Sequence, residues 1–191
     1  RFDIYNGMTK DELVTGGVIA SLGAKDASSK TLANTRRFYN SPDSSLMQGK
    51  NGRPFINLAI GSGYRGHPLA LTNEDRFYSV RDYQPFGKLT QDQYDEFDIV
   101  LDSELDDITT NFAPQLASNS PGWKLLLNHP TWQGEKVLSS SSTLQNAIFF
   151  TTYFPDASSL GKTCSPALGK NRAYGISAFD GSPLPRRDGS T

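Results

Sequence analysis

A glycine-rich segment is the first candidate for chemistry. Residues Gly61-Ser62-Gly63-Tyr64-Arg65-Gly66 match the phosphate-binding pattern G-x-G-x-x-G and follow the apolar segment 55–60. Asp82 stands where a dinucleotide-binding fold places an acid against ribose. Only residues 67–75 precede the next apolar segment, whereas a parallel crossover needs about a dozen residues or more. We therefore expect a bend or bulge at a strand end, where the backbone approaches closely, and not a nucleotide site.

The histidines and the cysteine are weak candidates for catalysis or metal binding. His67 and His129 are the only histidines, and each precedes a proline, which favours an extended or turn conformation. No carboxylate lies at helical spacing from them, and no serine lies in a G-x-S-x-G elbow. Cys164 is the single cysteine, so an internal disulfide is excluded. We expect structural roles for both histidines, and for Cys164 a lone thiol or a bond outside this chain.

An acidic segment is a candidate for partner binding. Between Asp92 and Asp107 there are eight acids and no base: Asp92, Asp95, Glu96, Asp98, Asp102, Glu104, Asp106 and Asp107. The spacing of a calcium loop is absent, so a solvated acidic face is favoured over a metal site. Such a face would meet a basic patch on a partner and set the association rate and specificity. The residues that we expect to contact the partner are Asp102, Glu104, Asp106 and Asp107.

The composition excludes several classes of protein. The chain has 191 residues, and 19 Lys and Arg nearly balance 20 Asp and Glu, which argues against a nucleic-acid-binding protein. No apolar run approaches the roughly eighteen residues of a membrane-spanning helix. At about 150 residues per domain, residues 1–191 are expected to form a single domain portion. Because residue 1 is Arg and the chain opens on a strand pattern, we interpret it as a piece of a larger protein.

Short apolar segments bounded by turn residues predict a mostly β fold. Thr90 and Gln93 form a capping box, which predicts a helix over 91–97. Ser103 and Asp106 form a looser version of this box, which predicts a second helix over 104–110, and both helices lie inside an acidic helical insertion at 83–121. Gln145-Asn146 occupies the place of a two-residue hairpin turn. The expected strands are 2–5, 17–22, 35–39, 55–60, 76–81, 124–127, 136–138, 147–153 and 173–179.

A weak internal repeat suggests a propeller. Segments 1–7, 76–82 and 172–181 each place an Arg before or within a short aromatic strand that leaves on Asp, Asn or Gly. Repeated antiparallel units of this kind are typical of β-propellers. The fold class that we expect is therefore mostly β, as part of a β-propeller.

Two sets of residues resemble known proteins. Segments 142–152 and 172–184 resemble a blade of the quinoprotein-like propellers. A longer series, in order, is similar to the C-terminal propeller of the PilY/PilC family of type IV pilus biogenesis factors and tip-associated adhesins. The segments that carry this second resemblance are 38–43, 55–69, 75–82, 90–94 and 134–138, and the family-motif residues to which we assign structural roles are Gly61, Gly63, Arg65, His67, Pro68, Arg81 and Asp82.

The resemblance implies a secreted, non-enzymatic protein. In that family the protein acts at the pilus tip, extracellularly or at the outer membrane, with minor pilins in assembly and in attachment to surfaces or host cells. Some members carry a calcium loop of alternating acids. That loop is absent here, so we expect no cofactor and assign no metal ligand.

Two alternatives stay open. One is a quinone-dependent dehydrogenase propeller, which needs an aromatic stacking platform, calcium-ligating acids and a catalytic base in one funnel. The chain offers Trp123 and Trp132 for the platform but no matching acid spacing. The other is a propeller scaffold that binds no ligand of its own.

Overall fold

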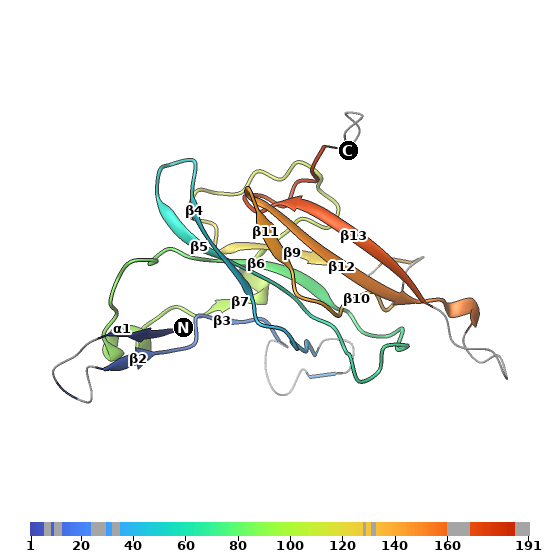
Figure 1. Ribbon diagram of the computed structural model, residues 1–191, viewed down its shortest axis with the longest axis horizontal. Coiled ribbons are helices and arrows are strands. Elements are labelled where there is room, and N and C mark those ends of the chain that lie inside the picture. Colours follow the sequence, from blue (N-terminus) through green and yellow to red (C-terminus); the bar gives the residue numbers. More distant parts are fainter. Residues whose placement is uncertain are drawn as a thin grey trace.

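Two main sheets pack face to face (Figure 1). One is wholly antiparallel, and the other is antiparallel except for one edge strand. The structure is a computed structural model, and the residues that it describes are 1–5, 9, 13–23, 30–31, 35–127, 129–130, 133–159 and 169–185. The predicted mostly β class is confirmed. In this described part of the chain the sheets are open, and neither closes into a barrel or a complete propeller.

The first sheet has the strand order β4-β5-β6-β9-β8, in which β8 (Asp106–Asp107) is a two-residue edge strand. Its antiparallel part consists of β4 (Asp43–Gln48), β5 (Pro54–Gly61), β6 (Arg76–Asp82) and β9 (Gly122–Leu126). Every second residue of β5 is buried from Phe55 to Ala59, as the two-residue period of a strand requires. Because β5 and β6 are antiparallel neighbours, the G-x-G-x-x-G motif between them does not lie in a parallel crossover, and the expected exclusion of a dinucleotide fold is confirmed.

The second sheet is centred on β12 (Ala147–Pro155). On one side β12 pairs with β13 (Gly169–Ser177), and on the other with β11 (Ser142–Leu144) and β10 (Lys136–Val137). Gln145 and Asn146 join β11 to β12 with φ values of 49° and 65°. Positive φ at both positions is the requirement of a type I′ hairpin turn, so the predicted turn is confirmed.

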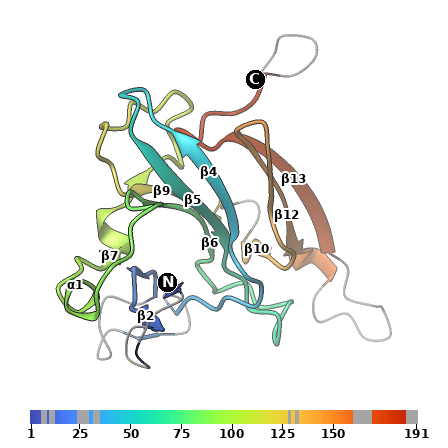
Figure 2. The same cartoon turned by 60° about the vertical axis from the view of Figure 1, so that its left-hand side comes forward.

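Figure 2 shows the sheet of β4, β5 and β6 facing the sheet of β12 and β13. Aromatic rings fill the space between these two sheets. Phe77 of β6 stacks on Phe150 of β12 with ring centroids 3.8 Å apart, and Tyr174 of β13 stacks on Phe150 at 4.7 Å. Trp123 of β9 is fully buried beside Phe77. The other buried apolar members of this core are Met47, Phe55, Ala59, Ile108, Leu127, Val137, Ile148, Ile176 and Ala178. Their burial supplies the main favourable contribution to folding.

Smaller elements cover the outer face of the first sheet. There β3 (Ala20–Ser21) pairs in parallel with β7 (Val100–Leu101), over a second apolar cluster of Tyr78, Val80 and Leu105. The hairpin of β1 (Phe2–Ile4) and β2 (Val14–Gly16) lies beside the helix α1 (Gln91–Asp95). The described residues also form two short 3-10 turns, η2 (Asp102–Glu104) and η3 (Ala157–Ser159).

The predicted start of α1 is confirmed. The backbone N–H of Gln93 donates to the Thr90 hydroxyl at 3.3 Å, and the Thr90 N–H donates to Oε1 of Gln93 at 2.9 Å. The predicted second helix over 104–110 is wrong. Asp106 and Asp107 form β8 (Asp106–Asp107), which pairs in parallel with Trp123 and Lys124 of β9. Strand pairing to a distant segment outweighs the local helical signal, so segment 83–121 contributes an edge to the sheet.

Two strand predictions also need correction. Residues 35–39 form no strand, although they are rich in residues that favour strands. The edge strand β4 was not predicted, because its sequence is polar and only Met47 is buried in it. The three repeat segments lie in β1, β6 and β13, which belong to three different sheets.

Candidate partner-binding site

At the glycine motif the backbone of the first sheet lies close to β10 of the second sheet. A methyl group on Gly61 would lie less than 3.0 Å from the Val137 side chain, and one on Gly63 less than 3.0 Å from the Val137 carbonyl oxygen. The backbone N–H of Val137 donates to the Ser62 carbonyl at 3.0 Å, and the Ser62 N–H donates to the Arg76 carbonyl at 2.8 Å. The predicted bend with a close backbone approach is therefore confirmed, and β10 occupies the space next to it.

The rest of the motif is tied to the second sheet. The Arg65 guanidinium donates to the Leu138 carbonyl at 2.7 Å, and the ring of His67 contacts Tyr64, with centroids 4.8 Å apart. Nζ of the fully buried Lys136 donates to the carbonyl of Pro68 at 2.9 Å. These contacts hold the loop after Gly63 in place, as expected of structural residues.

Lys136 makes the stability of the protein depend on pH in the alkaline range. Its Nζ also donates to the Ala70 carbonyl at 3.1 Å, so its donors are satisfied by backbone oxygens. Burial lowers the pKa of Lys136 to about 8 from the ordinary 10.5, and the negative charge of Asp75 opposes this shift. Above about pH 8 the unfolded chain therefore holds more protons at this residue than the folded chain, and the free energy of unfolding rises with pH.

We expect Lys136→Met to remove this rise. Urea unfolding of both proteins at pH 7.5 and pH 9.5 measures it, and the wild type should gain on the variant as the pH increases. Parallel pH profiles of the two proteins would contradict the assignment.

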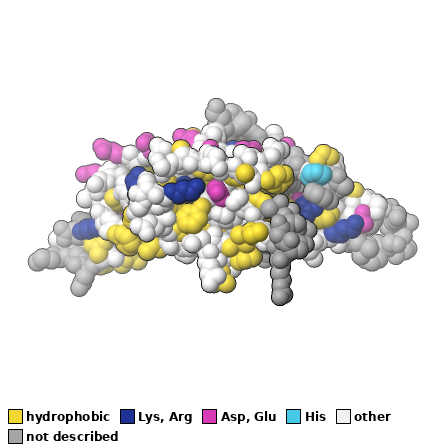
Figure 3. Space-filling view, turned by 90° about the horizontal axis from the view of Figure 1, so that it is seen from above, with side chains coloured by type: hydrophobic (Ala, Val, Ile, Leu, Met, Phe, Trp, Pro, Cys, Tyr) yellow, Lys and Arg dark blue, Asp and Glu magenta, His cyan; other side chains and the backbone are white. Residues whose placement is uncertain are grey.

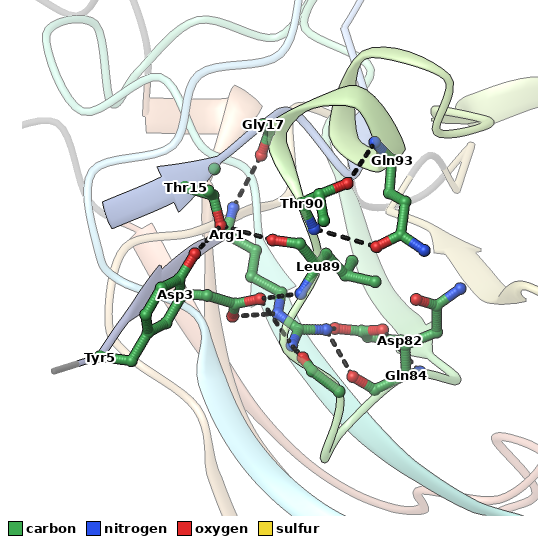
Figure 4. A network of polar contacts seen from close by, with 12 residues as sticks. Arg1, Asp3, Tyr5, Thr15, Gly17, Asp82, Gln84, Leu89, Thr90 and Gln93 are labelled. Carbon is green, nitrogen blue, oxygen red and sulfur yellow. Dashed lines mark hydrogen bonds and ion pairs between the residues drawn. The ribbon is translucent and has the colours of Figure 1, made fainter. Parts of the chain in front are cut away.

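The strand that ends in Arg81-Asp82 anchors the N-terminal hairpin (Figure 4). The Arg1 guanidinium donates to Asp82 and to Asp3, each at 2.9 Å, and the Gln84 N–H donates to Asp82 at 2.9 Å. Burial alone would raise the pKa of Asp3, but hydrogen bonds from the Leu89 N–H and from Arg1 outweigh it and hold this pKa below its ordinary value. Arg1 and Asp82 thus connect β1 to the end of β6.

Arg81 acts on the other face of the same strand end. Its guanidinium donates to the Phe179 carbonyl and to the Tyr83 hydroxyl, the latter at 3.2 Å, and lies over the ring of Phe55. Phe179 follows β13, so Arg81 connects the two sheets at this end. Both Arg81 and Asp82 therefore have structural contacts.

Asp102 is the centre of a charge cluster and is only partly accessible. Its carboxylate forms ion pairs with Arg76 and with Lys124, the latter at 3.1 Å, and accepts a hydrogen bond from the Tyr78 hydroxyl at 2.7 Å. Burial would raise the pKa of Asp102, but the hydrogen bonds from Tyr78 and Arg76 outweigh this effect and lower it. This carboxylate holds η2 against the first sheet.

The other three acids that we expected to contact a partner are exposed, and each also accepts a local hydrogen bond. Glu104 accepts from the Leu101 N–H at 2.7 Å. Asp106 accepts from the Ser120 hydroxyl at 2.6 Å, and Asp107 from the Thr109 N–H at 2.9 Å. The structure therefore does not gather the four acids Asp102, Glu104, Asp106 and Asp107 around one point. It distributes them along the edge formed by η2 and β8.

The acidic segment lines a groove at its other end. Two adjoining hollows, of about 170 and 350 Å³, share Gln84, Phe97 and Asp98 in their walls. Arg53 lines the smaller hollow and Glu96 the larger. Figure 3 shows Asp and Glu side chains along one edge of the molecule, most of them toward the end that carries α1. Glu96 and Asp98 are exposed, and we name these two residues the groove acids. Phe97 lies between them in the sequence.

The groove acids were counted in the acidic segment but not chosen as site residues. A signal was present in the sequence, because they flank an aromatic residue at the end of the helix predicted over 91–97. What the sequence does not show is that Gln84 and Arg53 come from other elements to complete the walls.

The described residues hold no group of three or more His, Cys, Asp or Glu side chains that could bind a metal ion. No helix among them is long and apolar enough to cross a membrane. Trp123 is fully buried in the core, so it is not an open stacking platform for a quinone. Cys164 and Trp132 lie outside the described residues, and predictions about them stay predictions.

Comparison with solved structures identifies a similar fold. The C-terminal domain of Pseudomonas aeruginosa PilY1 superposes with a TM-score of 0.60 over 90% of this chain, at 14% sequence identity. The fold is that of a PilY1-like C-terminal region. The resemblance seen in the sequence is thus confirmed at the level of the fold. The match spans 36% of the PilY1 chain, and no family model and no curated protein matches the sequence.

Proposed function

We propose that this chain is part of a non-enzymatic, extracellular protein associated with the tip of a type IV pilus. In this role it acts with minor pilins in pilus assembly and in attachment to surfaces or host cells. The observation that supports the proposal is the similarity to the PilY1 C-terminal domain across nine tenths of the chain. The resemblance of the glycine motif and the Arg81-Asp82 strand to the PilY/PilC family supports it from the sequence.

We also propose that the two sheets are neighbouring blades of a propeller. The order β4-β5-β6-β9 is an antiparallel array of four strands, as in a propeller blade, and it packs face to face on the sheet of β12 and β13. Small-angle X-ray scattering of a longer protein that includes this chain tests this proposal. A disc-shaped envelope supports it, and an elongated two-sheet envelope contradicts it.

The acidic edge supports a partner of opposite charge. Seven of the eight acids from Asp92 to Asp107 are exposed, and the groove acids line hollows with an aromatic wall. A basic patch on a minor pilin would gain both electrostatic attraction and contact with Phe97. Charged rims act mainly on the association rate, and salt screens them.

Reversal of the groove acids tests this surface. We expect the double variant Glu96→Lys, Asp98→Lys to weaken binding to purified minor pilins about tenfold at low salt, mainly through a slower association rate. Surface plasmon resonance at two salt concentrations measures both rates. Glu74→Lys makes the same change of charge at a position outside the acidic segment. It is the control for each of the two substitutions, Glu96→Lys and Asp98→Lys.

The outcomes separate two questions. Unchanged affinity in the double variant would contradict the acidic surface. Absence of any binding between the wild-type chain and a full set of minor pilins would contradict the assembly role itself.

A further inference from the structure

The edge of the second sheet formed by β13 is half occupied by the chain itself. After a turn at 178–181, the Ser177 N–H donates to the Ser182 carbonyl at 2.8 Å, and the Leu184 N–H donates to the Gly175 carbonyl at 3.1 Å. Pro183 forms a bridge with Ile176. Residues 182–184 therefore act as a short added strand at one end of β13.

At the other end of β13 the backbone groups have no strand partner within the part of the chain that the structure describes. The register between β12 and β13 is unbroken from Ser177 to Gly169, so backbone groups alternate between the two edges. Because Gly175 and Ser177 direct their groups toward residues 182–184, Asn171 and Ala173 direct theirs to the same side. Among the described residues no strand pairs with them there.

Apolar surface accompanies this open edge. A hollow of about 530 Å³ is lined by Phe112, Leu125, Tyr174 and Leu184 together with the small residues Ala173 and Gly175. Phe112 is 73% exposed and Phe149, on the outer face of the sheet, is 45% exposed. A side chain from an added strand could cover either of these two exposed rings.

Charge decides what kind of strand fits. Arg172 lies in the wall of this hollow, but it forms an ion pair with the buried Glu135 at 3.8 Å. Lys170, two residues away on the same face of β13, is exposed and gives this end of the edge a positive charge. If two copies of this chain paired antiparallel about Lys170, the two Lys170 side chains would lie opposite each other. Like charges directly opposite each other destabilise a strand pair. A second copy is therefore disfavoured, and an acidic side chain opposite Lys170 is favoured.

We propose that the open edge of β13 binds an extended acidic segment of another protein by β-strand addition. Main-chain hydrogen bonds to Asn171 and Ala173 supply the affinity. An acidic side chain of the added strand faces Lys170, and its neighbouring apolar side chains lie on the outer face beside Phe149. This binding mode is independent of the pilus assignment.

A designed peptide tests the proposal. The probe is the peptide TEVEVET, which alternates acids with valines, and fluorescence anisotropy measures its binding to the 191-residue chain. We expect saturable binding of TEVEVET with a dissociation constant below about 1 mM. The peptide TKVKVKT should bind at least about tenfold more weakly. N-methylation of the central amides of TEVEVET should weaken its binding to a similar extent.

Variants of the protein provide matched controls. Ala173→Pro removes an N–H that points to the open edge and should abolish binding, whereas Asn171→Ala keeps the backbone N–H and should preserve it. Lys170→Glu should weaken binding of TEVEVET about tenfold, whereas Lys88→Glu, at a lysine that lies over the ring of Tyr5 next to β1, should not.

Several results would overturn the proposal. They are absence of binding, equal binding of the lysine and glutamate peptides, and full binding of the N-methylated peptide. The peptide comparisons use the wild-type protein, so they do not depend on whether a variant folds. A concentration-dependent dimer that Ala173→Pro abolishes would show instead that the edge pairs with a second copy.

Discussion

Replacement of Gly61 or Gly63 by alanine is expected to destabilise the protein by about 2 to 3 kcal/mol, because a new methyl group has no room beside β10. The two variants should nevertheless differ in how they can be rescued. At Gly61 the methyl meets the side chain of Val137, whereas at Gly63 it meets the Val137 carbonyl oxygen. A change of Val137 to glycine removes the first obstacle and leaves the second.

A double-mutant cycle measures this difference. Val137→Gly alone should cost about 3 kcal/mol, since it removes a buried side chain from the core. Combined with Gly61→Ala, it should be less damaging than the sum of the two single changes by about 1 to 2 kcal/mol. Combined with Gly63→Ala, the effects should add. Urea unfolding gives each value, and equal coupling in both cycles would contradict the geometry.

Loss of the Asp102 carboxylate is expected to have a similarly large effect. Asp102→Asn keeps the size of the side chain but leaves Arg76 and Lys124 without their shared anion. Removal of one partner from a buried ion pair costs about 3 to 5 kcal/mol, and here the partial exposure of the three side chains reduces the expected cost to about 2 or 3 kcal/mol. Asp98→Asn, an exposed acid in the same segment, should change stability by less than about 0.5 kcal/mol.

The same carboxylate should make the protein sensitive to acid. Its pKa is lower in the folded state than the ordinary 3.8, so its stabilising contribution is complete above that value and disappears as the pH falls through the folded-state pKa. Between pH 5 and pH 3 the wild type should therefore lose stability relative to Asp102→Asn. Thermal unfolding monitored by circular dichroism across this range measures the difference. A constant gap between the two proteins would exclude Asp102 as the titrating group.

The consequence for partner binding is direct. Asp102 was expected to contact a partner, but a charge reversal there would disturb η2 and the first sheet before it reported on any interface. The groove acids Glu96 and Asp98 give a cleaner test, because their exposed side chains can be reversed with little effect on the core.

The sequence by itself determined the features that depend on neighbouring residues. The capping box at Thr90 and Gln93, the Gln145-Asn146 turn and the bend at Gly61 each rest on backbone conformations that a few adjacent residues decide. The main strands β5, β6 and β12 followed from their apolar patterns. The order of these local motifs was also enough to show the resemblance to the PilY/PilC family, which the fold then supported.

Only the tertiary structure decided the features that depend on distant pairings. Segment 104–110 has local helical signals, yet Asp106 and Asp107 pair with β9 because the sheet edge there offers hydrogen bonds and buries Leu105 and Ile108. The role of Asp102 depends on two cations that lie 26 and 22 residues away in the chain. The open half of β13 exists because residues 182–184 turn back and cover only its other half. Long-range contacts of this kind cost chain entropy and are stabilised by the whole core, so no local pattern reveals them.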